Sequence, residues 1–177
     1  MDPVCLTEFS VYLDQRPGEL AGLLGAARAA GVEMQSISTT EHMERGCVRI
    51  IGEPVDTLRR VCESLVESGV GPIVEAPVVA IPIDNRPGAV RDIAVLMSDN
   101  RINIRYVYLM PARGVNGSAK GEQGEGGNVR CVFRFDDLDK ALAVIRDADW
   151  PPGAANGAAN GNPQPGPCPR SGRMGRM

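Results

Sequence analysis

Apolar and polar side chains alternate along residues 9–13, where Phe9, Val11 and Leu13 are separated by Ser10 and Tyr12. A period of two is typical of a half-buried strand. A different spacing follows, because the next apolar residues recur at i, i+3, i+4 and i+7: Leu20, Leu23, Leu24 and Ala27. That spacing gathers them on one face of an amphipathic helix. The pattern therefore predicts a strand, a tight turn and a helix.

The same pattern occurs twice in the chain. Asp14-Gln15-Arg16-Pro17-Gly18 returns seventy residues later as Asp84-Asn85-Arg86-Pro87-Gly88, again between an alternating run at 79–83 and a helical stripe. The next predicted strands, at 31–34 and 101–104, keep the offset of seventy. An internal repeat of this kind indicates one supersecondary unit used twice.

The third predicted strands, at 48–50 and 129–131, are eighty-one residues apart, so the second copy has eleven additional residues. They fall in a segment from Pro111 to Gly127 that holds six glycines, which predicts a flexible hairpin. A second helical stripe opens at Val55 in copy one and at Leu138 in copy two. Each copy therefore reads βαββα, and the fold class is α+β.

The predicted domains are residues 1–76, residues 77–150 and a tail at 151–177. Copy one has a candidate fourth strand at 73–75, whereas Pro151 and Pro152 stop regular structure where copy two would need one. We therefore predict a three-stranded copy two, whose open edge is filled by copy one or by a second chain. The tail, rich in Gly, Ala, Asn and Pro, is predicted to be disordered.

Composition and charge narrow the function classes. The chain has 177 residues, of which 43% are hydrophobic, but no apolar run or leader that predicts a membrane span or a signal peptide. We expect a soluble, cytoplasmic protein that does not engage membranes. The tail holds three of the 19 basic residues and none of the 22 acidic ones, so the rest of the chain carries a formal charge of −6. Such a body is not expected to bind nucleic acid.

Few residues suggest catalysis or metal binding. The five cysteines form no CxxC pair and suggest neither a disulfide framework nor a zinc site. The single histidine, His42, has no aligned nucleophile, so a catalytic role is not predicted. The glycine-rich segment lacks the GxxxxGK[ST] pattern of a phosphate-binding loop. We therefore predict no catalytic residues, no metal and no cofactor.

The repeated turn is the best candidate for chemistry. Proline has its φ already set and suits the first helical position, while the following glycine lets a ligand approach the main chain. Free N–H groups and partial positive charge at a helix N-terminus favour a carboxylate. A Pro-Gly pair can also serve only to turn the chain.

The strand ending in Asp-Asn-Arg-Pro-Gly, the helix after it and the Ile102-Asn103-Ile104 that opens the next strand resemble the ACT domain. The resemblance spans residues 4 to 149 in two copies, with no catalytic domain attached, and is closest to stand-alone tandem ACT proteins. It implies ferredoxin-like βαββα(β) units with helices on one face of antiparallel sheets. It also implies pairing side by side or as a homodimer, with amino acids bound at interfaces near the first turn.

The resemblance also implies which residues touch the ligand. In copy two these are Asn85 and Asn103, whose amides can hold both ends of a zwitterion; in copy one they are Gln15 and Glu33. Because an ionised Glu33 would repel a carboxylate, we expect copy two, or a composite of both copies, to be the better site. The remaining candidates surround these positions: Arg86, Pro87, Gly88, Ile102, Arg105 and Gly18.

The predicted function is an amino-acid-binding regulatory or sensor protein that acts on an enzyme of amino-acid metabolism and has no catalytic activity of its own. The alternative is an assembly module with vestigial sites, which the departures at Gln15 and Glu33 keep open. Nucleic-acid binding through Phe133 and Phe135 ranks lower, because core packing explains both rings. An enzyme ranks last.

Overall fold

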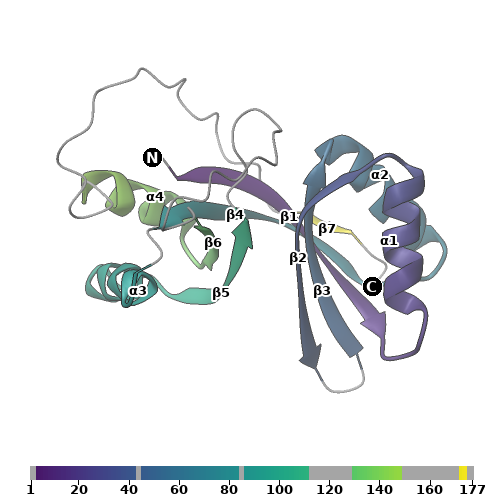
Figure 1. The fold of residues 1–177 in the computed structure, drawn as a ribbon, viewed down its shortest axis with the longest axis horizontal. Helices are drawn as coiled ribbons and strands as arrows, with labels where there is room; N and C mark the ends of the chain where they lie inside the picture. The colour runs from purple at the N-terminus through teal and green to yellow at the C-terminus, as the bar shows by residue number, and fades with distance from the viewer. Residues whose placement is uncertain (1–2, 43–44, 84–85, 112–128, 149–171, 175–177) are drawn as a thin grey trace. The chain divides into compact units, whose positions relative to one another are not determined.

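The computed structural model describes residues 3–42, 45–83, 86–111, 129–148 and 172–174. In this part of the chain four helices and seven strands follow one another (Figure 1): β1 (Val4–Asp14), α1 (Glu19–Ala29), β2 (Glu33–His42), β3 (Arg45–Glu53), α2 (Val55–Glu67), β4 (Ile73–Ile83), α3 (Ala89–Asp99), β5 (Ile104–Pro111), β6 (Val129–Phe135), α4 (Leu138–Asp147) and β7 (Gly172–Met174). The predicted α+β class with two βαββα units is confirmed. No helix among the described residues is both long enough and apolar enough to cross a membrane.

The chain forms two compact units. The first contains residues 6–77 and β7, and the second contains residues 3–5 and the described residues from 78 to 148. Strands β1 and β4 therefore contribute residues to both units. The sequence suggested a strand at 73–75 and another at 79–83, but these are the two halves of the continuous strand β4.

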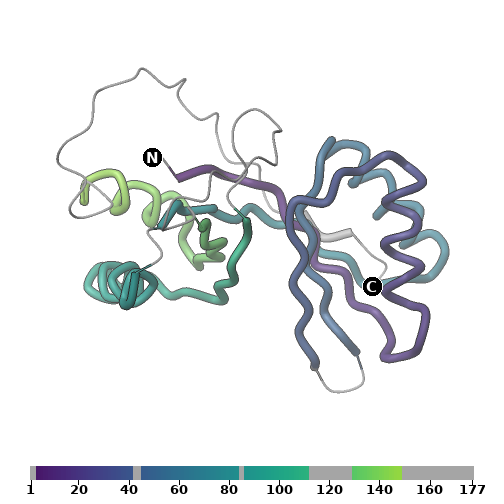
Figure 2. The backbone as a smooth tube through the Cα atoms, in the orientation of Figure 1, coloured from purple at the N-terminus to yellow at the C-terminus, as the bar shows by residue number. Residues whose placement is uncertain are grey.

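In the first unit the strands are hydrogen-bonded in the order β2-β3-β1-β4, and β3 is antiparallel to both β1 and β2. Helices α1 and α2 run side by side (Figure 2) and pack against one face of these strands. The alternation read from the sequence explains this arrangement, because Phe9, Val11 and Leu13 of β1 face the helices. They form a core with buried residues of the neighbouring elements: Leu23, Ala27, Val32, Val48, Ile50, Leu58, Cys62 and Ile73.

In the second unit the order is β4-β6-β5, with β6 antiparallel to both neighbours. The rings of Phe133 and Phe135 are fully or almost fully buried and stack with centroids 5.5 Å apart. Helices α3 and α4 bury an apolar face each: Ala89, Ile93 and Met97 on α3, and Ala141, Leu142 and Ile145 on α4. The two phenylalanines are therefore core residues.

The structure corrects the alignment of the third strands. Val11 pairs with Val48 in copy one, and its counterpart Ile81 pairs with Cys131, so the offset is eighty-three residues. The sequence comparison gave eighty-one. A shift of two residues keeps every side chain on the same face of a strand, so the apolar pattern could not reveal it.

Other backbone features do keep the offset of seventy. The β2–β3 ladder is irregular between Met34 and Ser36, and the β5–β6 ladder is irregular between Ile104 and Tyr106. Such an irregularity bends a strand and re-aims its side chains. The duplicated units thus share their local distortions as well as their order of elements.

The neighbours of β4 bear on the predicted open edge of copy two. In the strand order β4 lies between β1 and β6, and residues 3–5 of β1 belong to the same unit as residues 78–83 of β4. A strand of copy one thus borders the first strand of copy two. Strand β7, inside the segment predicted to be disordered, pairs with Ile73–Glu75. The rest of that segment lies outside the described residues.

Cysteines supply a further correction. Cys47, Cys62 and Cys131 are free and buried, and burial raises the pKa of Cys62 to about 12 and that of Cys131 to about 11. The thiols of Cys62 and Cys131 stay protonated at neutral pH, and all three buried cysteines behave as small apolar groups. Cys5, in contrast, is disulfide-bonded. The spacing of the cysteines does not predict this bond, because disulfide pairing depends on the path of the chain.

Candidate functional site

The repeated Arg-Pro-Gly segment forms a type II β-turn in both copies. In copy one the Glu19 N–H donates to the Arg16 carbonyl (3.4 Å), and Gly18 has φ 96° and ψ −24°. In copy two the Ala89 N–H donates to the Arg86 carbonyl (3.3 Å), and φ at Gly88 is 89°. This turn places proline second and requires a positive φ at its third residue, which glycine supplies without strain.

The turn also sets where each helix begins. We expected proline to be the first helical residue, but Gly18 and Gly88 are the N-caps, so Pro17 and Pro87 stand outside the helices. Among the described residues no side chain caps the N-terminus of α1 or α3, whereas Asp137 accepts a hydrogen bond from the Lys140 N–H of α4. The turn carbonyl accepts the first N–H of each helix, so the second and third N–H groups of α1 and α3 are the ones that an external acceptor could bind.

A mainly apolar cavity of about 240 Å³ lies beside the copy-one turn. It is enclosed by the end of β1, the first turns of α1 and the segment from α2 to β4: Leu13, Gly18, Glu19, Gly22, Leu23, Leu65 and Val70. Gly22 lines this space without filling it, and a Cβ added there would meet no atom within 4 Å. A larger side chain at position 22 could therefore occupy the space. We call this space the apolar cavity.

A charged cavity of about 220 Å³ adjoins it and shares Leu13, Glu19 and Val70. Its other lining residues come from β1, the turn, β3 and the segment before β4: Tyr12, Asp14, Arg16, Arg45, Ser68, Gly69 and Gly71. Burial, and next the Cys47 thiol, raise the pKa of Tyr12, so its hydroxyl stays protonated at neutral pH. We call this space the charged cavity.

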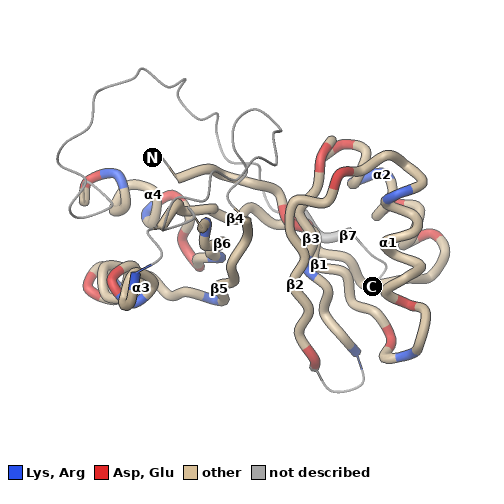
Figure 3. Tube along the Cα trace, in the orientation of Figure 1, with Lys and Arg blue, Asp and Glu red and all other residues tan. Residues whose placement is uncertain are grey.

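The charges around it are already paired with one another. Arg16 binds Asp14 (2.9 Å) and Glu19 (3.1 Å), while Arg45 approaches Asp14 (3.4 Å) and donates to the Gly71 carbonyl (2.9 Å). Acidic and basic residues are interspersed along this part of the backbone (Figure 3). The cluster therefore offers both carboxylates for a cation and guanidinium groups for an anion.

Two of the predicted copy-one residues line these spaces. Gly18 borders the apolar cavity, and Gln15 lines a third cavity of about 300 Å³ on the outside of the same turn. Glu33 does not join them. It pairs with Glu53 at one end of β3, whereas Asp14 pairs with Arg45 at the other end. Eight residues of strand separate these ends by ~26 Å.

The copy-two turn differs at the positions that open the apolar cavity. The counterparts of Glu19 and Gly22 are Ala89, which is buried, and Asp92. The Asp92 carboxylate accepts a hydrogen bond from Arg86 at 2.6 Å. An ion pair thus occupies the turn where copy one has an exposed glycine. Asn85, the central candidate of the sequence analysis, lies outside the described residues.

The other copy-two candidates lie at the far end of the sheet. The Asn103 N–H donates to the Asp136 carboxylate (3.0 Å), and the Asp136 N–H donates to the Asn103 carbonyl (3.1 Å). Ile102 is buried, and Arg105 is exposed at the irregular step of β5. Since the turn follows Ile83, which pairs with the opposite end of β6, the strand separates it from Asn103 by ~20 Å. One unit alone does not bring both to a single ligand.

Sequence reasoning missed Arg45, Glu19, Gly22, Leu65 and Val70. The first three could have been found by asking what pairs with the turn, since Arg45 opens the strand beside β1 and Gly22 is one helical turn past Gly18. The last two depend on how the end of α2 packs. That packing has no local sequence signal.

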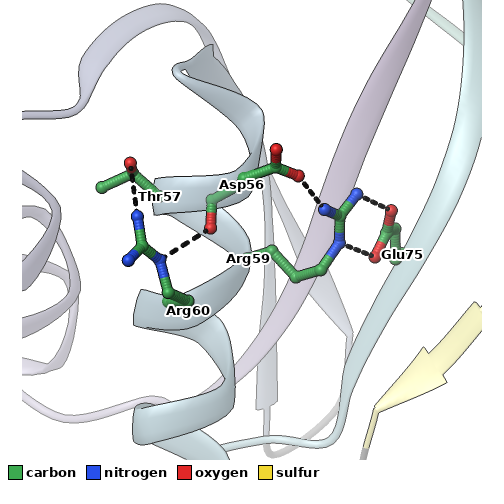
Figure 4. Close-up of polar contacts among 5 residues, drawn as sticks. All are labelled: Asp56, Thr57, Arg59, Arg60 and Glu75. Atoms are coloured by element: carbon green, nitrogen blue, oxygen red, sulfur yellow. Dashed lines mark hydrogen bonds and ion pairs between the residues drawn. The ribbon is translucent and has the colours of Figure 1, made fainter.

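A second charged cluster lies outside these cavities and ties α2 to β4 (Figure 4). The Arg59 guanidinium donates two hydrogen bonds to the nearly buried Glu75 (2.8 and 3.0 Å) and one to Asp56. The bonds to Glu75 raise the pKa of Arg59 above its ordinary value. Among the residues that the structure describes, the neighbouring Arg60 bonds only within α2, to Thr57 (3.2 Å) and the Asp56 carbonyl (3.3 Å). This arrangement serves packing between elements. No group of three potential metal ligands occurs among the described residues.

Comparison with known proteins adds a family and a fold. A search of curated proteins finds no match. Among solved structures, the chain resembles a Bacteroides thetaiotaomicron protein (TM-score 0.65, 18% identity, 84% of this chain and 91% of that one). It also resembles the ligand-free regulatory subunit of aspartate kinase from Thermus thermophilus (TM-score 0.54, 13% identity, 82% and 93%). The corresponding subunit from Thermus flavus is similar as well (TM-score 0.52, 14% identity, 84% and 97%).

At these identities the structures establish only the shared fold. The family model for an ACT domain pair matches residues 4–149, which cover both copies of the repeat and all four helices. The type II turns, the strand order and this match agree, and the chain belongs to the family of ACT domain pairs.

Proposed function

We propose that this protein is a non-catalytic regulatory module that binds an amino acid with an apolar side chain at the copy-one turn. One observation carries the proposal: an apolar cavity and a charged cavity meet beside an uncapped helix N-terminus. An amino acid has the same division into an apolar part and a charged part. The cavities, at about 240 and 220 Å³, together reach the lower range of small-ligand sites, about 300–1,000 Å³.

The chemistry assigns each part of the ligand to a place. The side chain would pack in the apolar cavity against Leu23, Leu65 and Val70. The carboxylate would accept from the N–H groups of Leu20 and Ala21, the second and third residues of α1, where the helix dipole favours negative charge. The ammonium group would approach Asp14 or Glu19, exchanging one of the exposed ion pairs of Arg16, which contribute little to stability.

The relatives support a regulatory role. Two of them are regulatory subunits of aspartate kinase, and this chain matches nearly the whole of each. We therefore propose that ligand binding shifts a partner, an enzyme of amino-acid metabolism, between states. A homodimer in the cytoplasm, without nucleic acid or membrane as partner, remains the prediction from the sequence.

Two alternatives are kept. Asn85 and Asn103 of copy two remain predicted ligand contacts, but Asn103 lies ~20 Å of strand away from the turn after Ile83, so it would need to meet the ligand with residues from elsewhere. The second alternative is an assembly module with vestigial sites, for which copy two supplies support, since Asp92 and Arg86 occupy its turn.

A thermal-shift panel of the twenty amino acids tests the proposal. At a concentration of about 100 times its dissociation constant, a ligand stabilises the folded state by about 2.7 kcal/mol, which is a shift of several degrees at about 2–4 °C per kcal/mol. We expect this shift with one or more aliphatic amino acids. No shift with any of the twenty would contradict the proposal and favour the assembly module.

Substitutions locate the site. Gly22→Leu adds a side chain at the apolar cavity, and Gly25→Leu adds the same side chain three residues along α1, where a Cβ also meets nothing within 4 Å. Both replace a helical glycine and should raise the unliganded melting temperature. Only Gly22→Leu should abolish the ligand shift. If Asn103→Ala abolishes it and Gly22→Leu does not, the site lies in copy two.

A further inference from the structure

Strand β7 adds to the first unit a strand that the repeat does not supply. Its residues Gly172–Met174 run antiparallel to Ile73–Glu75 of β4, so that Met174 lies opposite Ile73 (Figure 1). The ACT domain pair ends at residue 149, so β7 lies outside the fold of the family. The C-terminal part of this chain therefore has a docking place of its own on the sheet.

The backbone of β4 is oriented to receive a strand on this edge. The Tyr12 N–H donates to the Pro72 carbonyl (3.1 Å), so residue 72 directs its carbonyl toward β1. Because backbone groups point alternately to the two edges of a strand, Ile73 and Glu75 direct theirs away from β1 and toward β7. These are the positions at which an antiparallel ladder exchanges hydrogen bonds. The N–H and C=O groups of both residues are thus offered to a strand that lies here.

The receptive part of this edge is short and has little protection against pairing. Pro77 has no N–H and lies two residues after Glu75 on the same edge, so it ends the ladder there. Natural edges discourage pairing with charged side chains. Here, however, Ile73 is completely buried, and the Glu75 carboxylate is held by Arg59 (2.8 and 3.0 Å). We call residues 73–75 the docking edge.

Docking over three residues is weak by itself. The conformational entropy lost by each ordered residue is about as large as the net contribution of a backbone hydrogen bond. A covalent connection offsets this weakness, since 23 residues, 149–171, join the second unit to β7. The sequence predicts disorder from residue 151, and a disordered linker holds an attached segment at an effective concentration on the order of mM. The tether thus keeps β7 docked and leaves the contact itself exchangeable.

The sequence of the tail favours docking. Its last six residues are Gly-Arg-Met twice, at 172–174 and at 175–177, so a second copy follows the tripeptide that docks. From residue 151 onward the tail has three arginines and no acidic residue, whereas the rest of the chain has a formal charge of −6. Opposite net charges attract the tail toward the folded units.

We propose that the docking edge is a peptide-binding site and that the C-terminal tail is its built-in, displaceable occupant. The ligand class is a basic peptide in extended conformation, which adds to β4 as an antiparallel strand through main-chain hydrogen bonds. While the tail is docked, it competes with any such peptide from outside. The site uses backbone groups of β4 and not the cavities at the copy-one turn, so the proposal does not depend on amino-acid binding there.

Two alternatives make different predictions. A permanently docked tail would only cover the edge, and no peptide from outside would replace it. Attraction by charge alone would let a basic peptide bind the acidic units without forming a strand. Proline in place of methionine separates these cases, because it removes a backbone donor from the ladder and leaves the net charge unchanged.

Fluorescence anisotropy of a labelled peptide with the sequence of residues 169–177 measures the competition. The full chain with Met174→Pro and Met177→Pro cannot dock either copy of its own tripeptide. We expect this double variant to bind the peptide at least ~10-fold more tightly than the wild-type chain does, because its docking edge is free. Gln164→Pro makes a charge-neutral change to proline in the same tail, outside both tripeptides, and should keep the wild-type affinity. Far-UV circular dichroism of each variant verifies that it folds.

A peptide with proline at both methionine positions is the second control, and it should bind neither protein. Hydrogen exchange gives an independent readout, since the amides of Ile73 and Glu75 should exchange faster in the double variant and slow again when the peptide is added. Equal peptide affinity of the wild-type chain and the double variant overturns the proposal, as does the absence of binding to the double variant at mM peptide. Binding of the proline peptide overturns it in favour of charge attraction. Slow exchange of both amides in the double variant without peptide also contradicts it.

Discussion

At the scale of single residues, the two copies differ where a helix ends. Gly31 follows α1 with φ 75°, and its counterpart Arg101 follows α3 with φ 56°. Arg101 is the only non-glycine residue with a positive φ among those described. A left-handed conformation costs an L-residue about 1–2 kcal/mol, part of which glycine recovers. The duplication has kept the conformation while losing the residue that best tolerates it.

We therefore predict that Arg101→Gly stabilises the protein by about 0.5–1 kcal/mol. The reciprocal change, Gly31→Ala, should destabilise it by a similar amount, since a Cβ there meets no atom within 4 Å and only the backbone conformation is penalised. Urea unfolding of both variants measures the difference. Destabilisation by Arg101→Gly would mean that the arginine side chain contributes more than its backbone strain costs.

The sequence located the repeated turn but not the residues that surround it, also for reasons at the residue scale. The motif located the turn, because a type II turn demands glycine at one position and favours proline before it. The motif did not reveal that Gly22 and Asp92 have different structural effects, because the sequence predicts an exposed helical position for both. Only the structure shows that one leaves a cavity open and the other binds Arg86.

At the scale of elements, the Arg59–Glu75 pair attaches α2 to β4. Glu75 is 8% exposed, so removal of its partner would leave a nearly buried carboxylate without its main hydrogen bonds. We expect Arg59→Ala to destabilise the protein by about 2–3 kcal/mol. Arg60→Ala, the adjacent exposed arginine that bonds only within its helix, should cost less than about 0.5 kcal/mol.

Chemical denaturation of the two arginine variants makes the comparison. A double variant, Arg59→Met with Glu75→Gln, removes both charges and should recover part of the loss, because the isolated carboxylate is then gone. Equal effects of Arg59→Ala and Arg60→Ala would refute the role assigned to the pair.

Periodicity predicted the elements well, because apolar residues recur at intervals of 2 along a strand and about 3.6 along a helix when one face is buried. It could not predict that the strands at 73–75 and 79–83 are one strand, since Pro77 between them reads as a break. Periodicity could not fix the register of β6 either, because a shift of two residues leaves the alternation of apolar and polar residues unchanged. Connections between elements depend on tertiary hydrogen bonds, which local patterns do not encode.

At the scale of the whole molecule, strands β1 and β4 contribute residues to both units. Residues 6–14 of β1 and 73–77 of β4 belong to one unit, and residues 3–5 and 78–83 of the same strands belong to the other. Unfolding of either unit therefore releases one end of two strands that the other unit needs. Units of this size are also near the lower limit of independent stability.

We predict a single cooperative unfolding transition, in which a core substitution in one unit also loosens the other. Leu58→Ala removes a fully buried side chain of α2 and should cost about 2–5 kcal/mol. If the shared strands couple the units, hydrogen exchange should quicken in peptides from α3 and α4 as well as in those from α1 and α2. The exposed substitution Arg60→Ala, on the same helix, should leave exchange in both sets of peptides unchanged.

Calorimetry gives the second measurement, since a ratio of calorimetric to van't Hoff enthalpy near one is expected for a single transition. Two separate transitions, with exchange in α3 and α4 unaffected by Leu58→Ala, would show instead that each unit folds on its own half of β1 and β4.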